Sequence, residues 1–452
     1  MRSRGPVLVL ALALVTTAAC GSRVDEPSTI AGGAGGNGGG NGGGDAGGGE
    51  GGPPADAEAP CGPGDASGAT DTGVTDDTIA IATIQDIGGP RPGLFQANLD
   101  AMNAFVAYCN ELGGILGREL ELTAYDSRIS EHRSTTAQAC DSAFALVGQS
   151  VAIDSAGAQV GVDCGIPDIP AFAVETQHAG ATNVVQPLPN PPTLLNVGPE
   201  RYVKKEFPDA AKHAAMFFIS AGPSSVTAEK RVKGFEEIGF NFDVNSQTEL
   251  NELNWGPFVE QIRSNDVQFV TSVSELDNPV NLAKELRTQG VEVEIFELDQ
   301  VAYDPALIEK GGDVVEGVHV VVSTVPFEEA ETSDEMRRFL FWLEETDAKA
   351  ANPSALSVQG WSAGQLFATA AKNLGSDLTR EGLLAELRKI KEWDGHGIHA
   401  PANPGDNLVT QCFIYLKVEG GEFVREFPKE GFSCDEKNVV EVEYDFPKGA
   451  GT

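Results

Sequence analysis

The clearest structural signal lies in residues 79–125, which read IAIATIQDIGGPRPGLFQANLDAMNAFVAYCNELGGILGRELELTAY. Residues 79–84 form a short apolar run with the length of a buried strand, and residues 120–125 have the length and composition of a further strand. Between them, apolar residues recur at spacings of three and four from Leu99 to Cys109, which is the pattern of an amphipathic helix. Two strands joined by a helical crossover predict a parallel sheet with helices packed on its faces.

The same alternation of strands and helices continues along the chain and restarts after residue 183. It ends in a predicted hairpin over residues 411–427 with a turn at Gly420-Gly421. We therefore expect an α/β fold of two Rossmann-like lobes, each a parallel sheet flanked by helices. The expected divisions are a signal peptide at 1–19, a tether at 20–72, the first lobe at 73–196, the second lobe at 197–317, a return to the first lobe at 318–405, and a C-terminal hairpin and tail of the second lobe at 406–452.

The N-terminus predicts export. Arg2 and Arg4 precede an apolar run, residues 7–14, that is too short to cross a bilayer core of ~30 Å. The small residues that follow lead to Cys20 and resemble a lipobox, although Thr17 stands where leucine is usual. We expect lipidation at Cys20 and anchoring to the outer face of the cell membrane. Residues 21–60 are rich in glycine and poor in apolar side chains, which predicts a disordered tether.

The cysteine count agrees with export. The chain has seven cysteines, and six remain for pairing once Cys20 is set aside. Six cysteines allow fifteen sets of three disulfides, and the sequence alone does not choose among them. The layout favours Cys109–Cys140 on the first two helices and Cys412–Cys434 beside the hairpin, which by elimination leaves Cys61–Cys164.

The net charge of −36 disfavours nucleic acid as a partner. Gly360-Trp361-Ser362-Ala363-Gly364 matches GxSxG, but polar residues precede it where a nucleophile elbow needs a buried strand, so a serine hydrolase is only a remote alternative. His396 and His399 lie among glycines without an acidic or cysteine partner, which favours a loop over a metal site.

Several motifs resemble the leucine/isoleucine/valine-binding family of periplasmic binding proteins from ABC transporters. The most specific is Asn110–Arg118, NELGGILGR, and the similarity extends over residues 73–430. Further matches are Gly73–Ile79, Gly165-Ile166-Pro167, Leu286–Gly290 and Gly317-Val318. The resemblance implies the type I fold with a three-segment hinge and a monomeric, non-enzymatic subunit without cofactor or metal. It implies capture of a small polar solute, an amino acid or related amide or acid, in the cleft between the lobes for import through ABC permease subunits. A tethered sensor with the same fold is the alternative.

The resemblance also places ligand residues at the carboxyl ends of the strands. Ser155, with Ala156 beside it, and Thr176 match the positions that bind the ligand carboxylate, and Asp299 matches the acidic residue that binds its ammonium. The remaining candidates are Phe95, Ser225, Glu275 and Phe327, with Trp361 as a further aromatic candidate. Two expected tyrosines are absent, near Ser225 and Glu275, and Glu175 would repel a carboxylate. We therefore expect a ligand other than a simple branched-chain amino acid.

Overall fold

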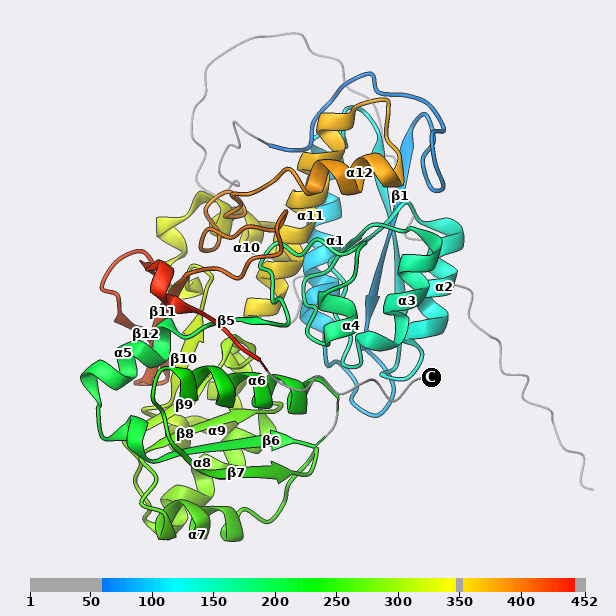
Figure 1. Cartoon of the computed structure of the whole chain (residues 1–452). Coiled ribbons are helices and arrows are strands. Elements are labelled where there is room, and N and C mark those ends of the chain that lie inside the picture. The colour runs from blue at the N-terminus through cyan, green and yellow to red at the C-terminus, as the bar shows by residue number, and fades with distance from the viewer. Residues whose placement is uncertain (1–58, 221, 347–352, 444–452) are drawn as a thin grey trace, which may run out of the picture. The chain divides into compact units, whose positions relative to one another are not determined.

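The structure is a computed structural model that describes residues 59–220, 222–346 and 353–443. The predicted signal peptide, the lipidation site Cys20 and residues 21–58 of the predicted tether lie outside these residues. Within the described part, two β-sheets are each flanked by helices (Figure 1). This arrangement confirms the predicted α/β fold of two lobes.

The first lobe is built on a parallel sheet with the strand order β2-β1-β3-β4. Its strands are β1 (Thr78–Gln85), β2 (Glu119–Asp126), β3 (Ala145–Val147) and β4 (Asp168–Ile169). Its helices are α1 (Gln96–Glu111), α2 (His132–Ser142), α3 (Ser155–Cys164), α4 (Thr176–Ala179), α10 (Asp334–Thr346), α11 (Ala355–Leu374) and α12 (Arg380–Leu387). Every residue of β1 from Ile81 to Gln85 is buried, as expected for a strand covered on both faces.

The second lobe is built on a mixed sheet with the order β12-β11-β10-β9-β8-β6-β7 and β13 paired to β11. Its strands are β6 (Ala214–Ile219), β7 (Phe242–Thr248), β8 (Phe269–Val273), β9 (Ile295–Leu298), β10 (His319–Val322), β11 (Cys412–Glu419), β12 (Glu422–Phe427) and β13 (Ser433–Cys434). Its α-helices are α5 (Gly198–Glu206), α6 (Pro223–Glu237), α7 (Gly256–Ser264), α8 (Asp277–Gln289) and α9 (Pro305–Gly311). The 3-10 helices are η1 (Ala210–Lys212), η2 (Gln300–Ala302), η3 (Gly312–Val315), η4 (Phe327–Thr332) and η5 (Glu436–Asn438).

Three chain segments join the lobes. The first runs into β5 (Leu194–Asn196), which pairs with β14 (Val439–Glu441). The second follows β10, which still pairs with β9 in the second lobe, so the chain leaves that lobe after Val322 and not at the predicted residue 318. The third leads into β11, and Asn196 ties it to the first segment by donating to the carbonyl oxygens of Thr410 (3.0 Å) and Cys412 (3.1 Å). The connections form the predicted three-segment hinge.

Residues 59–72 belong to the fold, which corrects the predicted extent of the tether. Cys61 is buried and disulfide-bonded to Cys109 at the end of α1, and Gly62 N–H donates to Gly114 O over 2.6 Å. The guanidinium of Arg118 donates to the carbonyl oxygen of Gly68 over 3.0 Å. Composition alone suggested disorder, but one covalent bond and these hydrogen bonds fix this segment against the first lobe.

The structure confirms disulfides at all six cysteines and corrects two of the three expected pairs. The bonds are Cys61–Cys109, Cys140–Cys164 and Cys412–Cys434. The chain moves from β1 to β2 in one direction across the sheet and from β2 to β3 in the other. Because such crossovers are right-handed, α1 and α2 lie on opposite faces of the sheet, as Figure 1 shows. Cys109 therefore cannot reach Cys140, whereas α2 and α3 pack together and bring Cys140 to Cys164.

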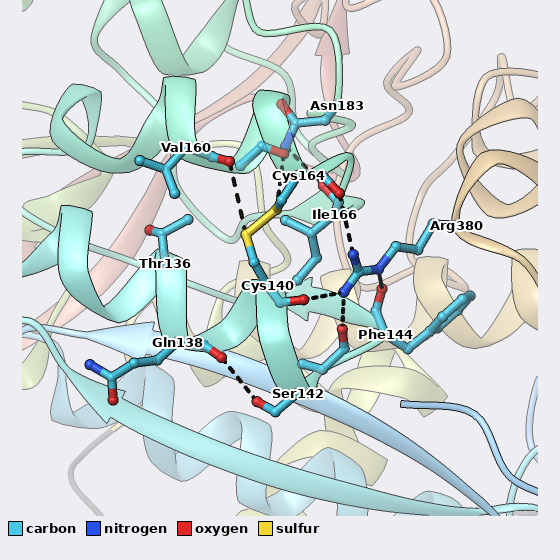
Figure 2. Close-up of a disulfide and its surroundings, with 12 residues drawn as sticks. Thr136, Gln138, Cys140, Ser142, Phe144, Val160, Cys164, Ile166, Asn183 and Arg380 are labelled. Atoms are coloured by element: carbon cyan, nitrogen blue, oxygen red, sulfur yellow. Dashed lines mark hydrogen bonds between the residues drawn. A yellow bond between two sulfur atoms is a disulfide. The ribbon is translucent and has the colours of Figure 1, made fainter. Parts of the chain in front are cut away.

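A single arginine links this disulfide to α12 (Figure 2). Arg380 donates to the carbonyl oxygens of Cys140 (2.8 Å), Cys164 (3.3 Å) and Phe144 (3.3 Å), and also to that of Ala143. These carbonyl groups end α2 and α3 and begin β3, where the helical hydrogen-bond pattern leaves acceptors without partners. Arg380 thus fastens α12, which belongs to the segment that returns to the first lobe, to the ends of α2 and α3.

Candidate functional site

A cavity of about 470 Å³ lies between the two lobes and beside the hinge. Its volume falls in the range of roughly 300–1,000 Å³ that is usual for small-molecule sites. The carboxyl ends of β1, β6, β8 and β9 lead into loops that line it, as expected for open α/β sheets.

The wall from the first lobe is largely apolar. Phe95 and Phe172 lie near each other, with ring centroids 6.2 Å apart, and Leu94, Ile153 and Val174 extend this surface. Phe95 directly precedes α1, and the other four residues stand in loops. This wall suits an apolar part of a ligand.

Behind that wall, two buried carboxylates accept hydrogen bonds from backbone N–H groups that could otherwise bind an anionic ligand. Asp86 follows β1 and accepts from Ala152 N–H (2.6 Å), Ile129 N–H and the hydroxyl of Ser127. Asp154 accepts from Val174 N–H over 2.6 Å. Both carboxylates are fully buried, so they hold the lining loops in place and add negative charge behind them.

Asp154 also belongs to a buried charge cluster. His178 in α4 contacts Asp154 through Nδ1 (3.1 Å) and Asp168 through Nε2 (2.8 Å). Burial alone would lower the pKa of His178, but the two carboxylates outweigh it and raise that pKa to about 10. His178 is therefore a cation at neutral pH and compensates for the carboxylates that hold the loop at Val174.

Glu175 occupies the N-terminus of α3. Its carboxylate accepts from Ser155 N–H over 2.9 Å, at the group where the resemblance placed the ligand carboxylate. Burial and the neighbouring Asp154 raise the pKa of Glu175. A helix N-terminus favours one negative group, and here a side chain of the chain supplies it.

In the second lobe, Arg231 of α6 is the cation that compensates for buried acidic side chains, as His178 does in the first lobe. Its guanidinium contacts Asp299 (3.2 Å) and Glu297 (3.4 Å), and it donates to the hydroxyl of Thr271. Asp299 is the predicted ammonium ligand, and it lines the cavity already paired with this cation. At the cavity's edge, Arg91 of the first lobe forms an ion pair with Glu275 of the second, which also lines the cavity.

Lys230 lines the cavity from α6 without a carboxylate within salt-bridge distance in the described residues. It is 5% exposed, and its ammonium donates to Asn190 Oδ1 (3.0 Å) and Pro191 O (2.6 Å), both neutral acceptors. Burial lowers the pKa of Lys230 to about 7. An ammonium has three donors, so these two bonds leave one N–H for a further acceptor.

Two further polar groups line the cavity with an atom that has no hydrogen-bond partner in the described structure. Gln359 of α11 is 1% exposed, and its Nε2 is unpaired. Glu200 of α5 is buried, and its Oε2 is unpaired. Burial and the neighbouring Glu297 raise the pKa of Glu200 well above its usual value, which favours the protonated form. Gln359 can therefore donate a hydrogen bond to a ligand, whereas the proton of Glu200 is shared with Glu297.

The cavity brings together only some of the candidates from sequence. Phe95, Glu275 and Asp299 line it, and their contact with a ligand stays a prediction. Ser155, Ala156 and Thr176 do not line it, because Glu175 lies over the start of α3. Ser225 is also outside the lining, although its neighbour Ser224 is part of it. Phe327 and Trp361 do not line the cavity either. Phe327 stacks on Tyr303, with 4.8 Å between ring centroids, and Trp361 is buried in the first-lobe core against Phe105.

Sequence reasoning missed Lys230, Glu200 and Gln359. All three lie on helices whose charged and polar positions look like solvated faces in the sequence. Their burial arises only because the hinge and the opposite lobe cover them. The one available signal was Lys230-Arg231, a basic pair on a helix in an otherwise acidic chain.

The GxSxG match is internal to a helix. Ser362 lies in α11, is fully buried, and shares a hydrogen bond of 2.8 Å with His399 Nε2. A nucleophile elbow requires an exposed strand-to-helix turn, which this position lacks. Burial lowers the pKa of His399 to about 4, so this histidine is a neutral structural partner of Ser362.

The sequence from residue 78 to 422 matches the family described as periplasmic binding protein. The chain belongs to this family. Membership confirms the suspected resemblance and the prediction that the chain is a solute-binding protein outside the cytoplasm and not an enzyme. No helix in the described residues is long and apolar enough to cross a membrane. A search of curated proteins finds no significant match.

Several solved structures have a similar fold. A leucine-binding protein from Thermotoga maritima is 20% identical, with a TM-score of 0.66 over 80% of this chain and 100% of that one. A fatty acid ABC transporter substrate-binding protein from Thermomonospora curvata is 18% identical, with a TM-score of 0.69 over 82% and 95%. A solute-binding protein of an ABC transporter from R. palustris, in complex with 4-hydroxybenzoate, is 17% identical, with a TM-score of 0.64 over 82% and 98%. At these identities the likeness concerns the fold.

Proposed function

We propose that this periplasmic binding protein is the extracytoplasmic solute-binding subunit of an ABC importer. It captures a small organic solute, an amino acid or a related amide or acid, in the cavity between its lobes and delivers it to permease subunits in the membrane. The observation that carries the proposal is the cavity itself, lined from both lobes and bordered by three hinge segments. A ligand that touches both lobes stabilises their closed arrangement, which is the form a permease can distinguish from the empty one.

The ligands named for the structural neighbours are consistent with this range of solutes. They include isoleucine, 4-hydroxybenzoate and benzoate, and one neighbour is described as a fatty acid transporter protein. These ligands differ in polarity, from an amino acid, which carries two charged groups, to acids with an apolar body.

The experiment is a thermal-shift screen of the full chain, expressed with its own signal peptide and purified in detergent, against amino acids, their amides, and aromatic and aliphatic acids. A solute at 100 times its Kd should stabilise the folded protein by about 2.7 kcal/mol. Isothermal titration should then give a stoichiometry of one solute per chain. If no compound in such a panel shifts the transition, solute capture in this cavity is contradicted.

We further propose that Cys20 carries the lipid anchor. The support comes from the sequence, where a charged start, a short apolar run and small residues precede this cysteine. Metabolic labelling with an alkyne fatty acid should mark the wild-type chain and leave Cys20→Ser unlabelled and released from membranes. Equal labelling of both chains would contradict the proposed anchor.

A further inference from the structure

We infer that the solute is a carboxylic acid with an apolar body and without an α-ammonium group, and that its carboxylate binds Lys230. The inference rests on the proposed function and narrows its ligand class. It follows from which charged groups of the cavity are already paired and which are not.

Acidic side chains of the protein itself fill the position where the carboxylate of an amino-acid ligand would bind. Glu175 accepts the N–H of Ser155 at the start of α3, and Asp154 accepts the N–H groups of Val174 and Glu175. A second carboxylate at this helix end would meet Glu175 and Asp154 at short range in a poorly solvated region. Like charges so placed repel strongly, so the first lobe excludes an anionic group there.

The place for the ammonium is occupied as well. Arg231 pairs with Asp299 and Glu297, and Arg91 pairs with Glu275. The other carboxyl group that lines the cavity, Glu200, favours its neutral form. Asp299 and Glu275 each already have a guanidinium partner, so an entering ammonium would compete with Arg231 or Arg91 for its carboxylate.

An anion, in contrast, finds a cation without an acidic partner. Lys230 is buried and held by two neutral oxygens, of Asn190 and Pro191, which leave one ammonium N–H available. Gln359 from the first lobe adds an unpaired amide donor to the same cavity. Donors from both lobes suit an acceptor-only group such as a carboxylate.

The rest of the ligand is apolar by the same reasoning. The first-lobe wall of Leu94, Phe95, Phe172 and Val174 offers rings and methyl groups and few donors. Burying apolar area of the ligand against this wall is favourable in proportion to the area removed from water. An aryl or alkyl carboxylate can therefore place its chain or ring on this wall and its acid group toward α6.

The experiment compares matched ligands on the full chain by isothermal titration at pH 6.5. The probes are the straight-chain carboxylates of six to ten carbons, phenylacetate and benzoate, the primary amide of each, and leucine. We expect at least one acid to bind at least tenfold more tightly than its own amide and than leucine. Lys230→Gln should abolish the preference for the acid over the amide, whereas Lys233→Gln, on the same helix but exposed, should keep it.

A structural role for Lys230 predicts a different result. If the lysine only fastens the hinge at Pro191, Lys230→Gln lowers the melting temperature but leaves the ratio of acid to amide affinity unchanged, and the inference is wrong. Should Lys230→Gln fail to fold, Gln359→Leu provides the second variant, and it should weaken the acid by at least threefold relative to its amide. Leucine or an amide binding as tightly as the best acid overturns the inference but keeps the proposed function. No binding by any probe or by the wider panel overturns both.

Discussion

At the scale of single residues, the buried cluster of His178, Asp154 and Asp168 sets the shape of the cavity wall. Removing the cation leaves two buried carboxylates without compensation. His178→Ala should therefore lower the free energy of unfolding by about 3–5 kcal/mol in urea denaturation. The control is His213→Ala, which breaks a half-exposed pair with Asp243 and should cost less than about 1 kcal/mol. Equal losses in the two variants would show that the cluster does not hold the wall.

The charge state of Lys230 gives binding a pH dependence. Burial lowers the pKa of this lysine to about 7, so the empty protein loses its ammonium proton as the pH rises above that value. Affinity for a carboxylate should be greatest below pH 7 and should fall by up to tenfold per pH unit above it. Titrations from pH 6 to 9 check this, and the fall in affinity should be smaller in Lys230→Gln than in the wild-type protein.

Other charged groups line the same cavity and need a control. They are Arg91, Glu200, Arg231, Glu275 and Asp299. The pKa of Glu200 is raised by burial and by Glu297, so its deprotonation would also disfavour an anion at high pH. Glu200→Gln removes that contribution, and the fall in affinity should persist in this variant. A pH profile that becomes flat in Glu200→Gln would assign the effect to the wrong group and contradict the role given to Lys230.

At the scale of elements, the turn between α1 and β2 explains why its motif is so specific. Gly114 has φ +73°, and a Cβ there would collide with the carbonyl oxygen of Arg118. Gly114→Ala should cost about 1–3 kcal/mol for the backbone conformation, and more for the collision. Gly290→Ala, at φ +63° with open space around it, should show only the conformational cost. Urea denaturation distinguishes the two, and equal losses would rule out the steric account.

The elements also show what sequence patterns can and cannot settle. Strand β1 was predictable because helices cover both faces of the sheet there and make the strand a continuous apolar run. Strand β2, at the edge of the sheet, was predictable from the alternation of apolar and polar residues that starts at Leu120. The disulfide pairs were not, because the face on which each helix packs depends on the direction of each crossover, which no local pattern encodes. Residues 59–72 looked like tether because their anchors, Cys109 and Arg118, are distant in sequence. Likewise, Lys230 became a candidate only once the fold had buried it.

At the scale of the whole globular part, solute capture requires two lobes that share one cavity and move about the hinge. Three connecting segments allow rotation of one lobe against the other while they keep the strand ends opposed. The position of the cavity between the lobes then makes ligand binding and closure a single equilibrium. Substitutions of single residues report on one lobe or one contact, whereas a distance between the lobes reports on closure itself.

The most direct measurement is the distance between spin labels on the two lobes, by pulsed electron spin resonance. The described cysteines are all disulfide-bonded, so in a Cys20→Ser background two introduced cysteines can be labelled selectively. They are Glu131→Cys in the first lobe and Leu253→Cys, at a side chain 83% exposed, in the second. Both lie within a few residues of the cavity lining, at Ile129 and Leu250. Saturation with the best-binding solute should shorten and narrow the distance distribution. A distribution that stays the same with solute bound would contradict capture between closing lobes.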